Sequence, residues 1–227
     1  MKISPQNNLY GSSCNFKGIP YARAALKTLP EYGDIVIYQL EKTDMPFLKK
    51  MIKNINLEKL APDVKNREQR DEWKHIIKEA AAGLDRDETV FLGTYKNKPC
   101  GIVSGIPYYN EEVSYLSYFA TWPYKAGENV KCAGKMLLKN VFEQAKRDKK
   151  AIGLVMDSKA PKGRRNNKTF YHKLKFHDLN NPKVYLKIVT AKDIPNVIEK
   201  EFDNVFSYEL LNSTQDKDLG KILDINF

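Results

Sequence analysis

The stretch from 115 to 176 constrains the fold most, because a strand, a loop, an amphipathic helix and a second strand follow one another there. The helix is predicted over 130–148, where apolar residues recur at helical spacing. These residues are Val130, Ala133, Leu137, Val141 and Ala145, flanked by Leu138 and Phe142. The run AIGLVM at 151–156 is typical of a buried strand. Because strand–helix–strand units pair their strands in parallel with a right-handed crossover, the sequence predicts an α/β domain.

The residues where this helix begins carry the clearest sign of chemistry. Asn129 is a residue type that caps helices, and the first turn after it exposes backbone N–H groups. These groups belong to Val130, Lys131 and Cys132. They add to the helix dipole and attract an anion, while Gly134 leaves room and the side chains of Lys131 and Lys135 add positive charge. The sequence therefore predicts a site for a phosphate-bearing ligand; the alternative is an ordinary turn with Gly134 chosen for close packing.

Two motifs in this stretch resemble those of the acetyl-CoA-dependent N-acetyltransferases of the GNAT superfamily. In that family a strand is followed by Pro, by a loop of the form Arg/Gln-x-x-Gly-x-Gly/Ala, and then by a Leu-Leu pair. Here the segment 121–123 (TWP) ends the strand, and 134–138 (GKMLL) matches the end of the loop. The family motif Phe/Leu-Tyr-x-Lys-x-Gly-Phe is matched at 170–176 (FYHKLKF), with its spacing kept.

The chain departs from both motifs at identifiable positions. Asn129 stands where Arg or Gln is usual, and Cys132 stands where the first loop Gly is usual. In the second motif, Lys175 replaces the Gly that precedes the final Phe. The loop after Pro123 is also longer than the common form. The resemblance covers roughly residues 35–190.

The resemblance implies a three-layer α/β (α+β) domain. Its sheet would be twisted, mixed and mostly antiparallel, with one splayed parallel strand pair and helices on both faces. We expect this domain at 35–211, between an irregular or partly disordered N-terminal extension at 1–34 and a C-terminal tail at 212–227. Within the extension, a helical turn or two is predicted at 21–29.

The resemblance also implies how acetyl-CoA would be held. The backbone of the strand end, Phe119, Ala120 and Thr121, would pair with the pantetheine arm as an added strand. Amides of the helix start would hold the pyrophosphate. The residues expected to contact the cofactor there are Asn129, Val130, Lys131, Cys132, Ala133, Gly134 and Lys135, with Asn167 from the later loop.

The implied reaction passes the acetyl group directly from the thioester to a primary amine. Tyr171, in the second motif, is the expected acid that protonates the departing thiolate; the alternative is a core aromatic residue. A base for the amine is sought among carboxylates, and Glu112 and Asp157 are the candidates. A solvated loop position is the alternative for each of them. No histidine or cysteine spacing indicates a metal site.

Composition indicates the cellular compartment and an anionic ligand, but it does not identify the amine acceptor. Three cysteines without a close pair favour a reducing compartment, so a cytoplasmic location is expected. No apolar run approaches the roughly 18 residues that span a membrane. The formal charge of +10 indicates an anionic ligand or partner, of which CoA is one. The densest basic cluster lies at 159–168, and it is equally consistent with a solvated loop.

Two other functions stay open from the sequence alone. The first is a non-catalytic protein with the same fold that binds an acyl-CoA or a protein partner. The second is a basic protein that binds tRNA or another nucleic acid. The acceptor is left open between a small amine, a peptide N-terminus, a lysine and an aminoacyl-tRNA, and the oligomeric state between monomer and dimer.

Overall fold

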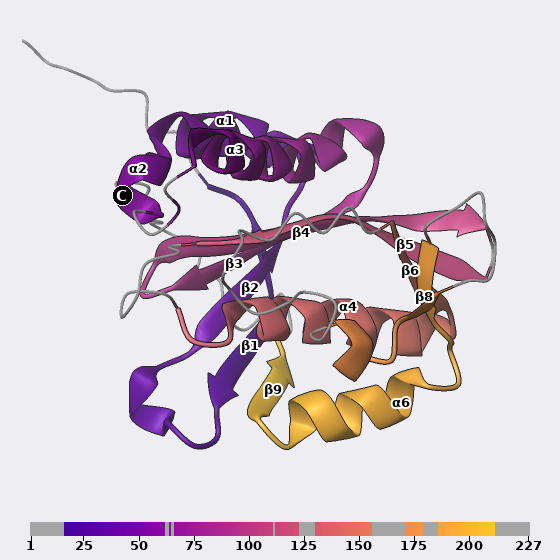
Figure 1. The fold of residues 1–227 in the computed structure, drawn as a ribbon. Helices are drawn as coiled ribbons and strands as arrows, with labels where there is room; N and C mark the ends of the chain where they lie inside the picture. The colour runs from indigo at the N-terminus through magenta and orange to yellow at the C-terminus, as the bar shows by residue number, and fades with distance from the viewer. Residues whose placement is uncertain are drawn as a thin grey trace, which may run out of the picture.

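The computed structural model describes residues 16–61, 64, 66–110, 112–122, 130–155, 171–178 and 186–211. These residues form three layers, in which a central sheet lies between α1–α3 on one face and α4 with α6 on the other (Figure 1). None of the helices in these ranges is both long enough and apolar enough to cross a membrane.

The described residues form a nine-stranded sheet in the order β7-β8-β6-β5-β4-β3-β2-β1-β9. The strands are β1 (Ile19–Leu26), β2 (Ile35–Gln39), β3 (Thr89–Tyr95), β4 (Lys98–Asn110), β5 (Val113–Thr121), β6 (Ala151–Val155), β7 (His177–Asp178), β8 (Leu186–Val189) and β9 (Phe206–Leu210). Their β5–β6 pair is parallel, and the other neighbouring pairs are antiparallel. The predicted fold class is confirmed.

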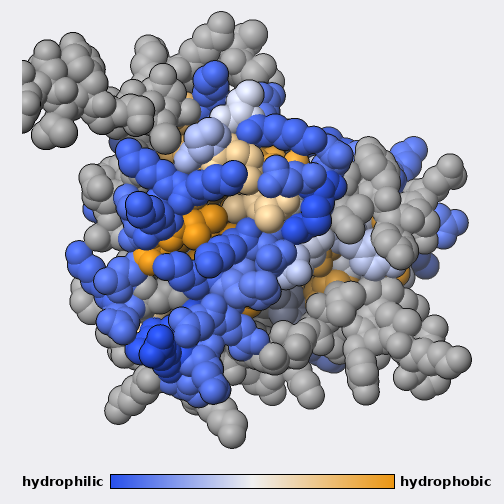
Figure 2. Space-filling view, turned by 90° about the horizontal axis from the view of Figure 1, so that it is seen from above, coloured by the Kyte–Doolittle hydropathy of each residue, from blue (hydrophilic) through white to orange (hydrophobic). Residues whose placement is uncertain are grey.

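The helices divide between the two faces of the sheet. The longer ones are α1 (Met45–Asn54), α3 (Arg67–Ala82) and α4 (Ala133–Asp148). Shorter elements are η1 (Pro30–Tyr32), η2 (Lys42–Asp44), α2 (Leu57–Leu60), η3 (Gly83–Arg86), α6 (Ile194–Val197) and η4 (Ile198–Asp203). The Asn66 side chain caps α3 by accepting a hydrogen bond from the Glu68 amide at 2.8 Å. Seen from the α1–α3 side, the surface is largely hydrophilic, with smaller apolar areas between (Figure 2).

The N-terminal extension is partly a member of the sheet, which corrects the prediction for 1–34. Residues 19–26 form β1, which pairs with β2 on one side and with β9 on the other. The helical turn predicted at 21–29 is therefore wrong. Residues 22, 24 and 26 are buried and their neighbours are not, which is the alternation of a half-buried strand. Residues 1–15 and the predicted tail at 212–227 lie outside the described ranges.

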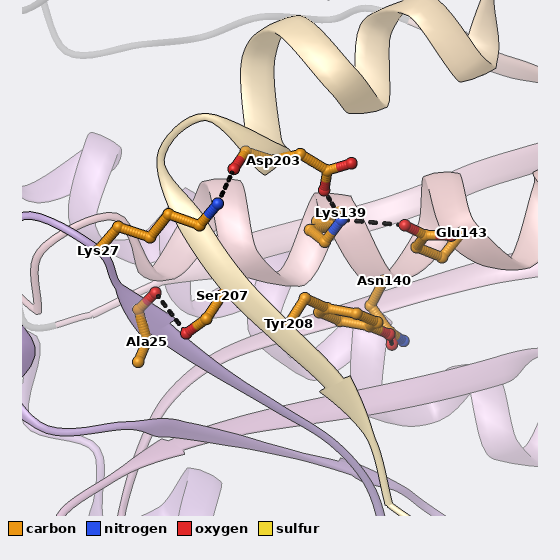
Figure 3. Close-up of polar contacts among 8 residues, drawn as sticks. All are labelled: Ala25, Lys27, Lys139, Asn140, Glu143, Asp203, Ser207 and Tyr208. Carbon is orange, nitrogen blue, oxygen red and sulfur yellow. Dashed lines mark hydrogen bonds and ion pairs between the residues drawn. The ribbon is translucent and has the colours of Figure 1, made fainter.

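A C-terminal layer of α6, η4 and β9 covers the outer side of α4. Lys139 of α4 is 2% exposed, and its ammonium pairs with Asp203 at 2.5 Å and with Glu143 at 2.9 Å (Figure 3). Asn140 accepts a hydrogen bond from the Tyr208 hydroxyl of β9 at 2.6 Å. Because a buried ammonium must be paired, these contacts fix the C-terminal layer on α4.

Candidate functional site

Strand β5 divides into two halves at a bulge. Its first half pairs with β6 in parallel, ending at Leu116↔Leu154. The register with β4 then passes from Gly105↔Leu116 to Ser104↔Tyr118, so Ser117 is the extra residue of a β-bulge. Bulges bend a strand and interrupt its pairing. Beyond Ser117, β5 therefore leaves β6, and no described residue pairs with the edge that it exposes.

The alternation of the β4–β5 ladder decides which backbone groups face this open edge. The Trp122 amide donates to the Cys100 carbonyl at 2.9 Å, so Trp122 points toward β4. Because backbone groups alternate in direction along a strand, Thr121 and Phe119 point toward the open edge. Ala120 points toward β4, where it pairs with Ile102. The prediction that the Ala120 backbone receives the pantetheine arm is therefore corrected, whereas those for Phe119 and Thr121 stay predictions.

Helix α4 begins later than the sequence predicts. Its first residue is Ala133, and Cys132 precedes it with φ 60° and ψ 12°, a left-handed conformation. The Ala133 amide donates to the Val130 carbonyl at 3.4 Å, which closes a turn of type II character over 130–133. The prediction of a helix capped by Asn129 and starting at Val130 is wrong in this respect. Asn129 itself lies outside the described residues.

The left-handed conformation at Cys132 explains why glycine suits this position. A positive φ is unfavourable for residues with a Cβ and is adopted by glycine without that cost. Cys132 therefore adopts a conformation that glycine would adopt at lower cost. Cys132 is exposed.

Two amides at the start of α4 remain available. Within its first turn, the Ala133 amide donates to the Val130 carbonyl at 3.4 Å. The Met136 amide donates to the Cys132 carbonyl at 3.0 Å. The amides of Gly134 and Lys135 have no backbone acceptor among the described residues. They are the donors that a helix leaves unsatisfied at its N-terminus, where the dipole is positive.

Gly134 holds these amides against the open half of β5. A Cβ built on Gly134 would lie 3.0 Å from Cζ of Phe119 and 3.6 Å from Cγ2 of Thr121. A side chain here would press on the Phe119 ring, so close packing and an open anion site both favour glycine. The α4 start and the open strand edge thus form one continuous candidate site.

The lysines of this site are engaged differently from what the sequence predicts. The Lys131 amide donates to the Tyr32 hydroxyl at 3.0 Å, and the Lys131 ammonium lies 5.7 Å from the centre of that ring. The Lys135 ammonium lies 3.3 Å from Oε2 of Glu201 in η4, so its charge is partnered there. Sequence reasoning missed Tyr32, because it belongs to the segment that was assigned to an irregular extension.

Tyr171 sits at the end of a helical turn with a well-defined C-terminal motif. The Phe176 amide donates to the Tyr171 carbonyl at 3.1 Å, and the Lys175 amide to the His172 carbonyl at 3.0 Å. These two bonds make a Schellman motif, in which Lys175 is the left-handed residue with φ 62°. The rings of Tyr171 and Phe176 meet edge to face at 5.6 Å, which supplies the apolar contact of that motif. Glycine is the residue usually preferred at this left-handed position, and Lys175 stands there instead.

The environment of the Tyr171 ring favours the neutral phenol. Tyr171, Phe119 and Val130 all pack against the core cluster that contains Ala133. Burial raises the pKa of the Tyr171 hydroxyl to about 12. The hydroxyl therefore stays protonated at neutral pH and is able to donate a proton.

Lys175→Gly is expected to stabilise the protein. A side chain at left-handed φ costs about 1–2 kcal/mol, and the extra chain entropy of glycine offsets about 0.5–1 kcal/mol of that. We expect the free energy of unfolding in urea to rise by roughly 0.5–1 kcal/mol. The control is Lys173→Gly, inside the same helical turn, which should lower it by about 1 kcal/mol. Destabilisation by both variants would contradict the left-handed assignment.

Of the two predicted carboxylates, Glu112 is the one that lies among the described residues. The Glu112 carbonyl accepts from the Ala151 amide at 2.9 Å, at the start of β5. Glu112 lies five residues before the bulge at Ser117, roughly 17 Å at about 3.3 Å per residue. Its role as a base stays a prediction. Asp157 and Asn167, together with the basic cluster at 159–168, lie outside the described residues.

Comparison with known proteins finds similarity in structure only. No protein-family model matches the sequence, and no curated protein matches it. The PaiA N-acetyltransferase from Thermoplasma acidophilum, solved with coenzyme A, is 14% identical, with a TM-score of 0.47 over 69% of this chain and 98% of that one. An acetyl-CoA-bound GNAT family acetyltransferase from Elizabethkingia anophelis is 15% identical, with a TM-score of 0.38 over 78% and 98%. Aminoglycoside 6′-acetyltransferase type Ii is 16% identical, with a TM-score of 0.41 over 68% and 96%.

Proposed function

We propose that this protein is an N-acetyltransferase that transfers the acetyl group of acetyl-CoA directly to a primary amine. The observation that carries the proposal is the position of two available amides, those of Gly134 and Lys135, against the open edge of β5. Each feature alone is common in proteins. Together they offer anion donors next to an unpaired strand, which are the two things that a nucleotide with an extended amide-containing arm needs.

Different backbone groups of the site would bind the different parts of acetyl-CoA. The backbone of Thr121 and Phe119 would pair with the amides of the pantetheine arm, as one strand pairs with another. The amides of Gly134 and Lys135 would donate to the pyrophosphate, with the positive pole of the α4 dipole behind them. The exposed Lys131 side chain stands one turn earlier and would add charge near the phosphates.

The reaction requires an acid for sulfur and leaves the acetyl group on nitrogen. The amine nitrogen attacks the thioester carbonyl carbon, so a C–N bond forms while the C–S bond breaks. Tyr171, protonated because burial raises its pKa, would donate its proton to the leaving sulfur. The products are the N-acetylated amine, which is an amide, and free CoA.

Calorimetry and a thiol-release assay test this proposal together. We expect CoA to bind the purified protein with one site per chain, and acetyl-CoA to release thiol when a primary amine is added. Binding without turnover for any amine would indicate a non-catalytic CoA-binding protein. Absence of CoA binding would overturn the proposal, and binding of tRNA that weakens steeply with salt would then favour the nucleic-acid alternative.

A further inference from the structure

A residue of the N-terminal segment holds the turn that leads into α4. Tyr32 is the last residue of η1, between β1 and β2. Its hydroxyl accepts a hydrogen bond from the Lys131 amide at 3.0 Å, although Lys131 lies 99 residues later in the chain. Lys131 belongs to the turn over 130–133, whose last residue begins α4. The hydrogen bond therefore joins the start of α4 to the segment between the first two strands.

The Tyr32 hydroxyl has a well-defined position because the rest of the residue is held by β3. The rings of Tyr32 and Tyr95 stack, with their centres 4.7 Å apart and their planes at 15°. The Tyr95 hydroxyl donates to the Tyr32 carbonyl at 2.6 Å. Tyr95 is the last residue of β3, which lies between β2 and β4 in the sheet. Tyr32 thus fixes the turn over 130–133 relative to the sheet.

The turn over 130–133 needs an external contact because its own conformation is unfavourable. Cys132 has φ 60°, which is disfavoured for a residue with a Cβ. The bond that closes the turn, from the Ala133 amide to the Val130 carbonyl, is long at 3.4 Å. Unfavourable backbone conformations persist where the surrounding structure holds them in place. The hydrogen bond from Lys131 to Tyr32 is a contact of this kind.

The shape of this turn decides where the first free amides of α4 point. Gly134 and Lys135 follow Cys132 within three residues, so a change in the backbone angles of Cys132 would rotate both amides. In the present shape, a Cβ on Gly134 would lie 3.0 Å from Cζ of Phe119. The contact places the two amides beside the open edge of β5. The Tyr32 hydroxyl therefore influences these amides through the turn, although it lies on another element.

We propose that Tyr32 is a positioning residue of the CoA site, which holds the turn over 130–133 in the shape that aims the Gly134 and Lys135 amides at the pyrophosphate; this rests on the proposed acetyltransferase function. Tyr32 acts through the Lys131 amide, whereas the pantetheine arm pairs with β5. The segment from β1 to η1 is then part of the cofactor site. Loss of the Tyr32 hydroxyl should weaken the grip on the pyrophosphate and leave the arm unaffected.

The charge state of Tyr32 is compatible with this role. Burial raises the pKa of the Tyr32 hydroxyl above its ordinary value. The hydroxyl is therefore neutral at physiological pH and places no negative charge beside the anion site. A carboxylate would also accept the Lys131 amide bond, but it would repel the pyrophosphate. A neutral acceptor at this position holds the turn without that repulsion.

Calorimetry of Tyr32→Phe with two ligands tests the assignment. CoA carries the pyrophosphate, and pantetheine is its arm without the nucleotide. We expect Tyr32→Phe to lower the affinity for CoA about fivefold, as expected for one lost hydrogen bond. The affinity for pantetheine should stay within about twofold of that of wild-type protein, because pantetheine has no pyrophosphate. The ratio of the two affinities is the readout, since a general loss of structure would lower both.

The matched control is Tyr208→Phe. It also removes one hydroxyl that anchors α4, because the Tyr208 hydroxyl donates to Asn140 at 2.6 Å, but it leaves the turn over 130–133 untouched. We expect Tyr208→Phe to lower the unfolding temperature and to bind CoA as wild-type protein does. Unchanged CoA affinity in Tyr32→Phe, an equal loss for pantetheine, or an equal loss in Tyr208→Phe would each overturn the inference. Failure of wild-type protein to bind CoA would instead overturn the proposed function.

Discussion

Gly134→Glu is expected to lower the affinity for CoA by at least about 100-fold, since it places a carboxylate among the donors that face the pyrophosphate. The amides of Gly134 and Lys135 would then serve the new side chain or face a repelling charge. Because acidic residues in the first turn of a helix are favourable to its dipole, the helix itself should not be weakened electrostatically. Calorimetry with CoA measures the effect, and thermal unfolding measures the fold.

Gly134→Gln separates charge from size in this experiment. Its side chain matches glutamate in volume, and it presses on Phe119 in the same way, because a Cβ there lies 3.0 Å from Cζ of Phe119. We expect Gly134→Gln to weaken CoA binding by about tenfold at most. The remaining loss of affinity in Gly134→Glu, roughly another factor of ten, would then come from its charge. Unchanged affinity in Gly134→Glu, with the protein folded, would reject the placement of the pyrophosphate at α4.

Tyr171→Phe is expected to lower kcat by about 10²-fold, as loss of a general acid does. The affinity for acetyl-CoA should change little, because the ring and its edge-to-face contact with Phe176 remain. Thiol-release kinetics over a range of acetyl-CoA concentrations separates kcat from KM. A variant with wild-type kcat would remove Tyr171 from the mechanism.

The pH dependence of the same variant adds an independent check. Because burial raises the pKa of Tyr171 to about 12, its hydroxyl is protonated throughout the range from about pH 6 to pH 10. The proton-bound form is lost only as the pH rises toward 12. The ratio of wild-type to Tyr171→Phe rates should therefore stay constant below pH 10. A ratio that falls between pH 7 and 9 would show a hydroxyl that ionises with a lower pKa.

Much of the domain was predictable because its signals are local. The strand predicted at 151–156 corresponds to β6 (Ala151–Val155). The periodicity of 130–148 predicts α4, and the glycine preference of the second motif corresponds to the left-handed residue Lys175. Such features depend on neighbours within one turn of helix or one strand, so the sequence carries them directly.

The errors at the start of α4 have a single physical cause. By residue type alone, Asn129 is a better N-cap than Cys132, so the local sequence predicts a helix that starts after Asn129. The left-handed conformation of Cys132 overrides that preference, because it lets Gly134 reach Phe119 on β5. Local propensity is worth about 1 kcal/mol, and tertiary packing against the sheet is worth more.

What the sequence determined by itself is the order of elements, the parallel unit around α4 and the approximate place of the candidate site. Only the tertiary structure decided that residues 19–26 join the sheet, since β1 lies between β2 and β9, a strand almost two hundred residues away along the chain. The same holds for the buried ammonium of Lys139, which pairs with Asp203. In each case a residue that looks solvated in its own segment is buried by a partner far along the chain, and no local pattern encodes that partner.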